Sequence, residues 1–182
     1  MNLPNYITLF RIFLVPFIFT QLVSYGPGQE RRRLVALTLL VTACLTDALD
    51  GFLARTLRQK TQLGRFLDPL ADKLLILSGF LGLLFVPSSL PYHPPLWITV
   101  TIVFRDLVIV LGLSVIFLMK GQIEIQPNLL GKSCTAFQMA TLCSILLRWN
   151  IAVPLSYITA FLTIASCGVY ISRELKKLQN PL

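Results

Sequence analysis

The sequence predicts an all-α membrane protein with six transmembrane helices, and three observations support this fold class. Of the 182 residues, 55% are hydrophobic and only 13% are charged, which is more apolar than an ordinary soluble core requires. The hydrophobic residues gather in runs of about 20 residues, the length that crosses a bilayer as a helix. Short segments rich in proline, glycine or charge separate these runs. The length predicts a single domain, residues 1–182.

The runs can be placed in order along the chain. The first is expected at 6–25, after a short amphipathic lead, and Pro16 should kink it because proline removes the hydrogen bond to the Ile12 carbonyl. A turn, GPGQERRR, precedes the second run at 33–53. Asp68 and Pro69 are typical of an N-cap and a first helical residue, so the third helix is expected to begin there and to end near 86. The remaining helices are expected at 96–119, 131–149 and 151–172.

The formal net charge of +8 raises the question of which anion the chain meets. Nucleic acid is not expected, because no basic stripe interleaved with aromatic residues lies outside the apolar runs. An anionic membrane surface and an anionic substrate explain the charge better. Basic residues are more frequent in the connections after the second and fourth runs and in the C-terminal tail, which predicts that these parts face the cytoplasm. We expect the membrane to be the inner membrane of a bacterium. Three consecutive arginines, Arg31-Arg32-Arg33, fall on the opposite side and do not fit this orientation. The sequence alone does not explain them.

Four of the eight acidic residues lie close together in the sequence: Asp47, Asp50, Asp68 and Asp72. Spacings of three and four residues place each pair on one face of its own helix. A carboxylate at membrane depth is costly unless it is paired, bound to a metal or faces a wet cavity. We therefore expect the two faces to meet. Oxygen-rich clusters suit hard divalent cations, so the pattern predicts a site for Mg²⁺ or Mn²⁺.

Small residues and one arginine lie between the two acid pairs. Gly51 and Ala54 leave little bulk beside the carboxylates, so a phosphate or a sugar can approach the backbone closely. Arg55 can donate two hydrogen bonds to phosphate oxygens. With Gly64, these residues are typical of a site for a diphosphate bound through metal ions.

The spacing also resembles that of a known family. Asp47-x2-Asp50-Gly51-x2-Ala54-Arg55-x8-Gly64-x3-Asp68-x3-Asp72 matches, position for position, the signature of the CDP-alcohol phosphatidyltransferases. The opening LPNYITLFRIFLVP and the segment GKSCTAFQM extend the resemblance over nearly the whole chain. It implies six transmembrane helices in the lipid bilayer, a homodimer and a cavity that faces the cytoplasm.

The resemblance further implies a role for each signature residue. Asp47, Asp50, Asp68 and Asp72 would hold two divalent ions, and Asp72 would also be the general base. The residues that would bind the CDP part of CDP-diacylglycerol are Gly51, Ala54, Arg55 and Gly64. No Ser, Cys or His is placed to act as a nucleophile, so we expect direct transfer of the phosphatidyl group to the acceptor alcohol.

Three polar residues, Asn5, Thr8 and Arg11, share one side of the first run. By position alone they fit a helix cap and an arginine that extends to the membrane surface. The resemblance favours a place facing the site.

Two cations in or beside apolar runs, Arg105 and Lys132, are predicted to bind the phosphate of the acceptor, with Arg11 as a further candidate. Adjacent residues on a helix do not face each other, so Arg105 and Asp106 should have different partners. For Asp106 we expect a salt bridge to another helix, and for Arg105 a ligand.

The acceptor itself is less sharply defined. The N-terminal stretch and GKSCTAFQM resemble the branch of the family whose acceptor is glycerol 3-phosphate, and this acceptor is favoured. Many members of that branch carry Arg-Glu where this chain has Arg105-Asp106. Arg-Asp is also seen in cardiolipin synthases of the CDP-using type, whose acceptor is phosphatidylglycerol. Both acceptors therefore stay open.

Two functions from other classes also place acids within a membrane. A Mg²⁺ transporter would leave Gly51, Ala54, Arg55 and Gly64 unexplained. An intramembrane prenyltransferase would need more spans and a different aspartate spacing. Metal-dependent release of CMP and the choice of donor distinguish these alternatives from a phosphatidyltransferase.

Overall fold

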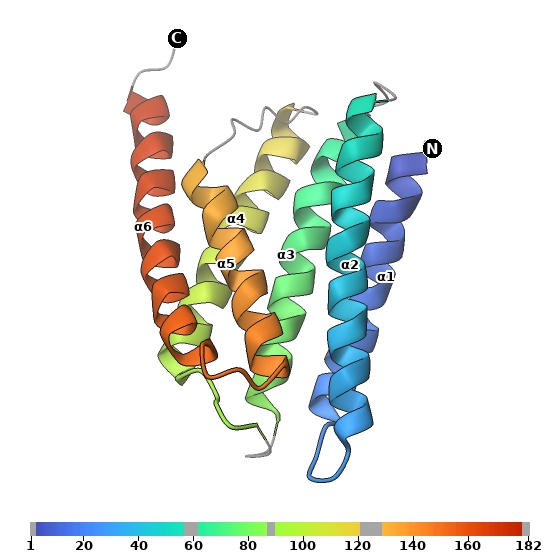
Figure 1. The fold of residues 1–182 in the computed structure, drawn as a ribbon. Coiled ribbons are helices and arrows are strands. Elements are labelled where there is room, and N and C mark those ends of the chain that lie inside the picture. The colour runs from blue at the N-terminus through green and yellow to red at the C-terminus, as the bar shows by residue number, and fades with distance from the viewer. Residues whose placement is uncertain (1–2, 57–61, 87–89, 121–128, 180–182) are drawn as a thin grey trace.

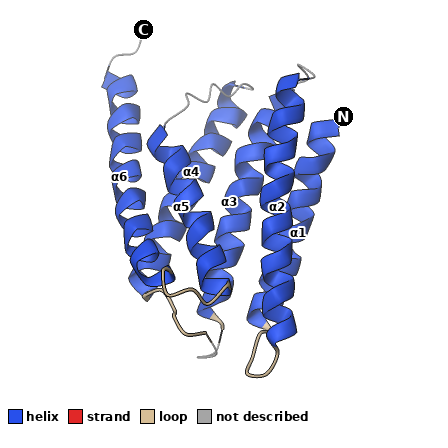
Figure 2. Cartoon of the chain, viewed as in Figure 1, coloured by secondary structure: helices blue, strands red, loops and turns tan. Residues whose placement is uncertain are grey.

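The computed structural model describes the backbone of residues 3–56, 62–86, 90–120 and 129–179. Within these ranges the side chains at 3–5, 48–56, 62–63, 65–66, 113, 116–120, 129 and 170–179 are not described. The described residues form six helices and no strand (Figure 2), which confirms the all-α prediction. The helices are α1 Leu3–Val23, α2 Glu30–Thr56, α3 Gln62–Leu84, α4 Leu96–Lys120, α5 Leu129–Leu146 and α6 Ala152–Gln179.

The predicted start of the third helix is wrong. Helix α3 begins at Gln62, so Asp68 is not its N-cap and Pro69 lies inside the helix. A proline there forgoes one backbone hydrogen bond, yet the helix continues through it. Because Asp68 is not needed as a cap, its carboxylate is available to another helix.

The helices stand side by side in one bundle (Figure 1). Helix α1 packs on α2 and α3, α3 also packs on α4, and α6 packs on α4 and α5. The end of α2 and the start of α3 lie at the same end of the bundle as the start of α1. This topology brings the start of α1 next to the signature, which runs from the end of α2 into the start of α3.

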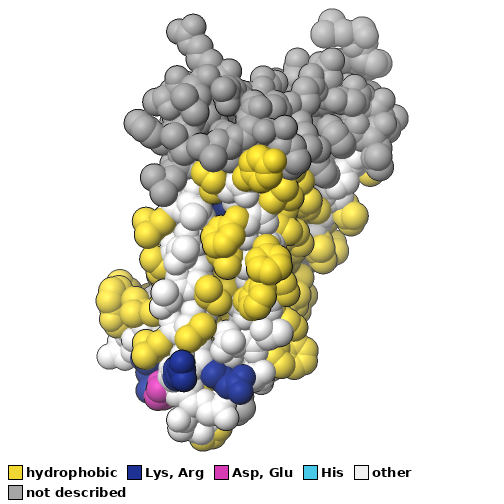
Figure 3. All heavy atoms as spheres, turned by 90° about the vertical axis from the view of Figure 1, so that its right-hand side faces the viewer, with side chains coloured by type: hydrophobic (Ala, Val, Ile, Leu, Met, Phe, Trp, Pro, Cys, Tyr) yellow, Lys and Arg dark blue, Asp and Glu magenta, His cyan; other side chains and the backbone are white. Residues whose placement is uncertain are grey.

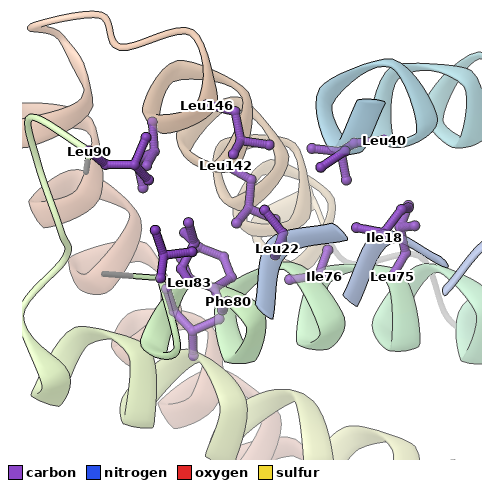
Figure 4. Packing of buried hydrophobic residues seen from close by; sticks show 14 of the residues in the cluster. Ile18, Leu22, Leu40, Leu75, Ile76, Phe80, Leu83, Leu90, Leu142 and Leu146 are labelled. Atoms are coloured by element: carbon purple, nitrogen blue, oxygen red, sulfur yellow. The ribbon is translucent and has the colours of Figure 1, made fainter. Parts of the chain in front are cut away.

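The apolar core lies between α1, α3 and α5, with contributions from α2 and α4 (Figure 4). Leu22 of α1 lies near Ile76 and Phe80 of α3, and Ile18 of α1 lies near Leu75 of α3 (Figure 4). All five side chains are buried. Close approach of the two helices depends on Gly82, where an added Cβ would lie 2.9 Å from the Cβ of Leu22. Glycine is therefore needed there for packing, since real Cβ contacts are essentially never that short.

The outer surface of the bundle is unusually apolar. On the face that includes α1 and α2, hydrophobic side chains cover the middle, while charged side chains gather at the lower end (Figure 3). Exposed residues of α1 alone include Tyr6, Leu9, Phe10, Phe13 and Phe17. Among the described residues, two helices contain windows long and apolar enough to cross a membrane, Tyr6–Val23 and Ala152–Val169.

A cluster of paired charges lies at the end of the bundle opposite the signature. It gives partners to Arg33, one of the three consecutive arginines that the predicted orientation left unexplained. Arg33 donates to Glu30 at 2.8 Å and to the backbone carbonyl of Leu146 at the end of α5. Arg148 donates to Glu30 and, at 2.8 Å, to the hydroxyl of Tyr25. The hydrogen bond from Arg33, supported by Arg148, holds the pKa of Glu30 below its usual value. Arg33 thus joins the α1–α2 hairpin to α5 through a paired charge.

Candidate functional site

The polar face of α1 meets the signature aspartates directly. Thr8 Oγ1 donates a 2.7 Å hydrogen bond to Asp68 Oδ1 on α3. One turn further on, Arg11 Nη1 lies 2.7 Å from Asp72 Oδ1 on α3 and 2.8 Å from Asp47 Oδ1 on α2. A single guanidinium nitrogen therefore bridges the two acid-bearing helices.

Burial in this cluster is uneven. The side chain of Arg11 is 0% exposed, whereas those of Asp72 and Asp47 are 33% and 46% exposed. The cation thus lies on the inner side of the carboxylates, whose outer surfaces stay open to a ligand. Because a buried arginine is tolerated only when it is well paired, both carboxylates hold Arg11 in place.

Some of the predicted site residues can be placed only in part. Gly64 is buried in the first turn of α3. Five others lie within helices, but their side chains are outside the described residues: Asn5, Asp50, Gly51, Ala54 and Arg55. The predicted meeting of the acid faces can therefore be followed at Asp47, Asp68 and Asp72.

The carboxylate oxygens of this cluster are suitable ligands for a divalent ion. Carboxylate oxygens are the ligands that Mg²⁺ and Mn²⁺ prefer, and the oxygens of Asp47 and Asp72 already converge on one cation. Among the described side chains there is no group of three or more His, Cys, Asp and Glu residues arranged to hold a metal. Asp50, which would complete the set, has no described side chain.

A second charged cluster lies on the face of α3 that meets α4 and α5. Lys73 Nζ donates to Asp106 Oδ1 on α4 at 3.0 Å, and Arg105 Nη1 donates to the same oxygen at 2.7 Å. Arg105 Nη2 donates to Ser166 Oγ on α6 at 2.7 Å, and Lys73 also reaches Thr135 Oγ1 on α5 at 3.2 Å. We call Lys73, Arg105 and Asp106 the buried triad. It joins four helices.

The buried triad bears out one expectation and corrects another. Asp106 does pair with another helix, through Lys73. The expectation that Arg105 and Asp106 cannot meet is wrong, because the long arginine side chain reaches back to its neighbour's carboxylate. Lys73 was not predicted as a site residue. Its position next to Asp72 was visible in the sequence, but its partners on α4 and α5 were not.

The triad carries two cations and one carboxylate, all less than a tenth exposed. Asp106 Oδ2 and Arg105 Nε are buried without a hydrogen-bond partner among the described residues. The same holds for both amide atoms of Gln138 on α5. Lys132, in the first turn of α5, is exposed, unlike these buried groups. This part of the bundle therefore has unused capacity to bind a polar or anionic group.

Comparison with known proteins places the chain in a family. The family model for CDP-alcohol phosphatidyltransferase matches residues 1–167. The chain belongs to the CDP-alcohol phosphatidyltransferase family. It is thus a member of an enzyme family, and the resemblance seen in the signature is confirmed.

Three curated relatives show which branch of the family is similar. The chain is 31% identical to the CDP-diacylglycerol–glycerol-3-phosphate 3-phosphatidyltransferase of Bacillus subtilis over 98% of both chains. It is 34% identical to the protein of the same name from Escherichia coli, over 94% of this chain and 93% of that one. A probable phosphatidylglycerophosphate synthase of Mycobacterium tuberculosis is 44% identical over 63% of this chain, and the match spans about half (53%) of that relative.

Proposed function

We propose that this chain transfers the phosphatidyl group of CDP-diacylglycerol to glycerol 3-phosphate, forming phosphatidylglycerophosphate and CMP. The observation that carries the proposal is the convergence of Asp47 and Asp72 on one cation at the end of the bundle where α2 meets α3. Within the family signature, these acids belong to the site for the diphosphate. The names of the full-length relatives favour glycerol 3-phosphate as acceptor.

A bilayer setting is part of the same proposal. The bundle exposes large apolar side chains and buries polar ones, such as Thr8, Gln138, Thr159 and Ser166. This distribution suits a lipid surround, in which polar groups gain by facing the interior. We propose six spans, a homodimer in a bacterial inner membrane and a site open to the cytoplasm. The basic residues near the signature end support this orientation.

The donor would be held by the helix faces around the signature. Gly51, Ala54 and Gly64 would let the CDP moiety approach the backbone, and Arg55 would bind its phosphate oxygens. Asp47, Asp50, Asp68 and Asp72 would hold two divalent ions, Mg²⁺ or Mn²⁺. Bound there, the ions would neutralise the diphosphate and stabilise the departing CMP. Thr8 would keep the Asp68 carboxylate oriented through its 2.7 Å hydrogen bond.

The transfer step would be a direct displacement. The acceptor hydroxyl oxygen forms a bond to the phosphatidyl phosphorus as the bond from that phosphorus to the CMP oxygen breaks. The hydroxyl proton passes to Asp72, the general base. Asp72 suits this task because it is one helical turn beyond Asp68 and keeps a third of its side-chain surface exposed.

The acceptor phosphate would bind at the face of α3 that carries Lys73. Two cations share one oxygen of Asp106 in the buried triad, so the triad favours an added anion. Lys132 adds an exposed cation at the start of the neighbouring helix α5. Arg105 and Lys132 would thus fix the phosphate of glycerol 3-phosphate, with the hydroxyl directed towards Asp72.

One assay tests the activity directly. Purified protein in detergent micelles is given CDP-diacylglycerol with glycerol 3-phosphate, and both CMP and the lipid product are measured by mass spectrometry. We expect equal amounts of CMP and phosphatidylglycerophosphate. Transfer from a prenyl diphosphate instead, or no CMP release with metal supplied, would contradict the proposal.

A further inference from the structure

Arg11 pairs with carboxylates that would also hold a divalent ion. Its Nη1 atom lies 2.7 Å and 2.8 Å from the carboxylate oxygens of Asp72 and Asp47, and its side chain is fully buried. Asp72 and Asp47 are also among the carboxylates that would hold a divalent ion. The guanidinium and the ion would therefore compete for them.

Displacement of Arg11 would have a cost of its own. A buried arginine whose carboxylates are taken over by a metal loses two charge partners, which is unfavourable. The cost falls when an anion arrives beside it, and a guanidinium is well suited to two phosphate oxygens at once. A diphosphate brought in with the metal is such an anion.

We propose that Arg11 couples the binding of divalent ions to the binding of the diphosphate. Without ligands it pairs with both Asp47 and Asp72. When ions take these carboxylates, Arg11 turns to the diphosphate oxygens. The inference rests on the proposed function, since it assumes a nucleoside diphosphate in this site. It makes Arg11 a positioning residue that disfavours a site loaded with metal alone.

Thermodynamic linkage gives the inference a measurable form. If the diphosphate relieves the cost of displacing Arg11, then CDP tightens Mn²⁺ binding and Mn²⁺ tightens CDP binding by the same factor. Free Mn²⁺ in solution is measured by electron paramagnetic resonance during titration of the purified protein in micelles, with and without CDP. CDP binding is measured separately by calorimetry.

The decisive variant is Arg11→Met, which removes the competing cation and keeps an unbranched side chain. We expect Mn²⁺ to bind this variant about tenfold or more tightly than wild type when CDP is absent, the scale of one charge-assisted hydrogen bond. The effect of CDP on Mn²⁺ affinity should shrink towards none. In EDTA the variant should unfold at a lower temperature than wild type, and Mn²⁺ should raise its unfolding temperature by a larger amount.

A matched control is Arg31→Met, at an exposed arginine at the opposite end of α2. It should leave Mn²⁺ affinity and its coupling to CDP unchanged. Arg11→Lys keeps a shorter cation and should fall between wild type and Arg11→Met, which gives a second reading if the Met variant does not fold.

The outcomes separate the two claims. A purely structural role for Arg11 predicts weaker Mn²⁺ binding in both Arg11 variants, and that result, or unchanged coupling, would overturn the inference. If CDP fails to bind wild type in the presence of Mn²⁺, the proposed donor is wrong and the inference falls with it. Tighter Mn²⁺ binding with lost coupling is the result that the inference requires.

Discussion

Asp72 and Lys73 are neighbours on α3, yet their side chains belong to different clusters. Asp72 accepts a hydrogen bond from Arg11 of α1 at 2.7 Å, and Lys73 donates to Asp106 of α4 at 3.0 Å. Adjacent positions on one helix therefore belong to the cluster assigned to the donor and to the cluster assigned to the acceptor phosphate. Substitutions in the two clusters should therefore affect donor binding and acceptor binding separately.

The first prediction concerns divalent ions. EDTA should abolish CMP release, and Mg²⁺ or Mn²⁺ should restore it, because a diphosphate cannot approach the signature aspartates without cations between them. The measurement is CMP formation in micelles before and after metal replacement. Full activity in protein shown to be metal-free would rule out the assigned role of the aspartates.

The second prediction separates the roles of the acids. Asp72→Asn removes the general base but keeps an oxygen ligand, so CDP-diacylglycerol should still bind while the rate falls by ~10²–10⁴-fold. Asp50→Ala should weaken donor binding and catalysis together. Rates and donor dissociation constants are measured for both. An Asp72→Asn enzyme with more than about a tenth of the wild-type rate would refute the assignment of the base.

The third prediction concerns the acceptor side. Lys132→Ala and Arg105→Ala should raise the KM for glycerol 3-phosphate by roughly ten- to a hundred-fold, the loss of a charge-assisted hydrogen bond, with donor binding nearly unchanged. Lys132 is exposed, so its variant should keep the thermal stability of wild type. Arg105 is buried between Asp106 and Ser166, so its variant should also lose stability.

The two acceptor variants therefore control for each other. If Arg105→Ala lowers the unfolding temperature without changing the KM for glycerol 3-phosphate, Arg105 serves only to join α4 to α6. An unchanged KM in Lys132→Ala would remove Lys132 from the acceptor site.

The fourth prediction concerns the packing that positions α1. Gly82→Ala would force a Cβ to within 2.9 Å of the Leu22 Cβ, and should cost about 1–3 kcal/mol of unfolding free energy. Gly168→Ala is the matched control, because a Cβ at Gly168 meets nothing within 4 Å. Denaturant unfolding in micelles compares the two. Equal stability of the two variants would contradict the described contact between α1 and α3.

Several features could be predicted from the sequence because they depend on local pattern. The helical class follows from long apolar runs, and the face shared by Asp68 and Asp72 follows from their spacing of four. The polar face of α1 was also visible at three-residue spacing, and the structure places Thr8 and Arg11 against the aspartates. The catalytic and binding roles of these residues stay predictions.

Other features could not be predicted because they depend on tertiary contacts or on side-chain length. Proline is common in the first turn of a helix, but α3 begins at Gln62 and Pro69 lies inside it. The pairing of Arg33 with the end of α5 needs two segments that the sequence does not place together. Arg105 reaches Asp106 because its side chain is long, although helix geometry directs the two residues apart.

A competition experiment between two acceptor alcohols decides which of them the protein uses. Purified protein in micelles receives CDP-diacylglycerol, Mg²⁺, and equal amounts of glycerol 3-phosphate and phosphatidylglycerol carrying different isotopic labels, and the labelled lipid products are resolved by mass spectrometry. The proposed function predicts that phosphatidylglycerophosphate accumulates with an equal amount of CMP, and that cardiolipin is a minor product or absent. Cardiolipin as the main product would contradict it, and would make Arg105-Asp106 the mark of a cardiolipin synthase.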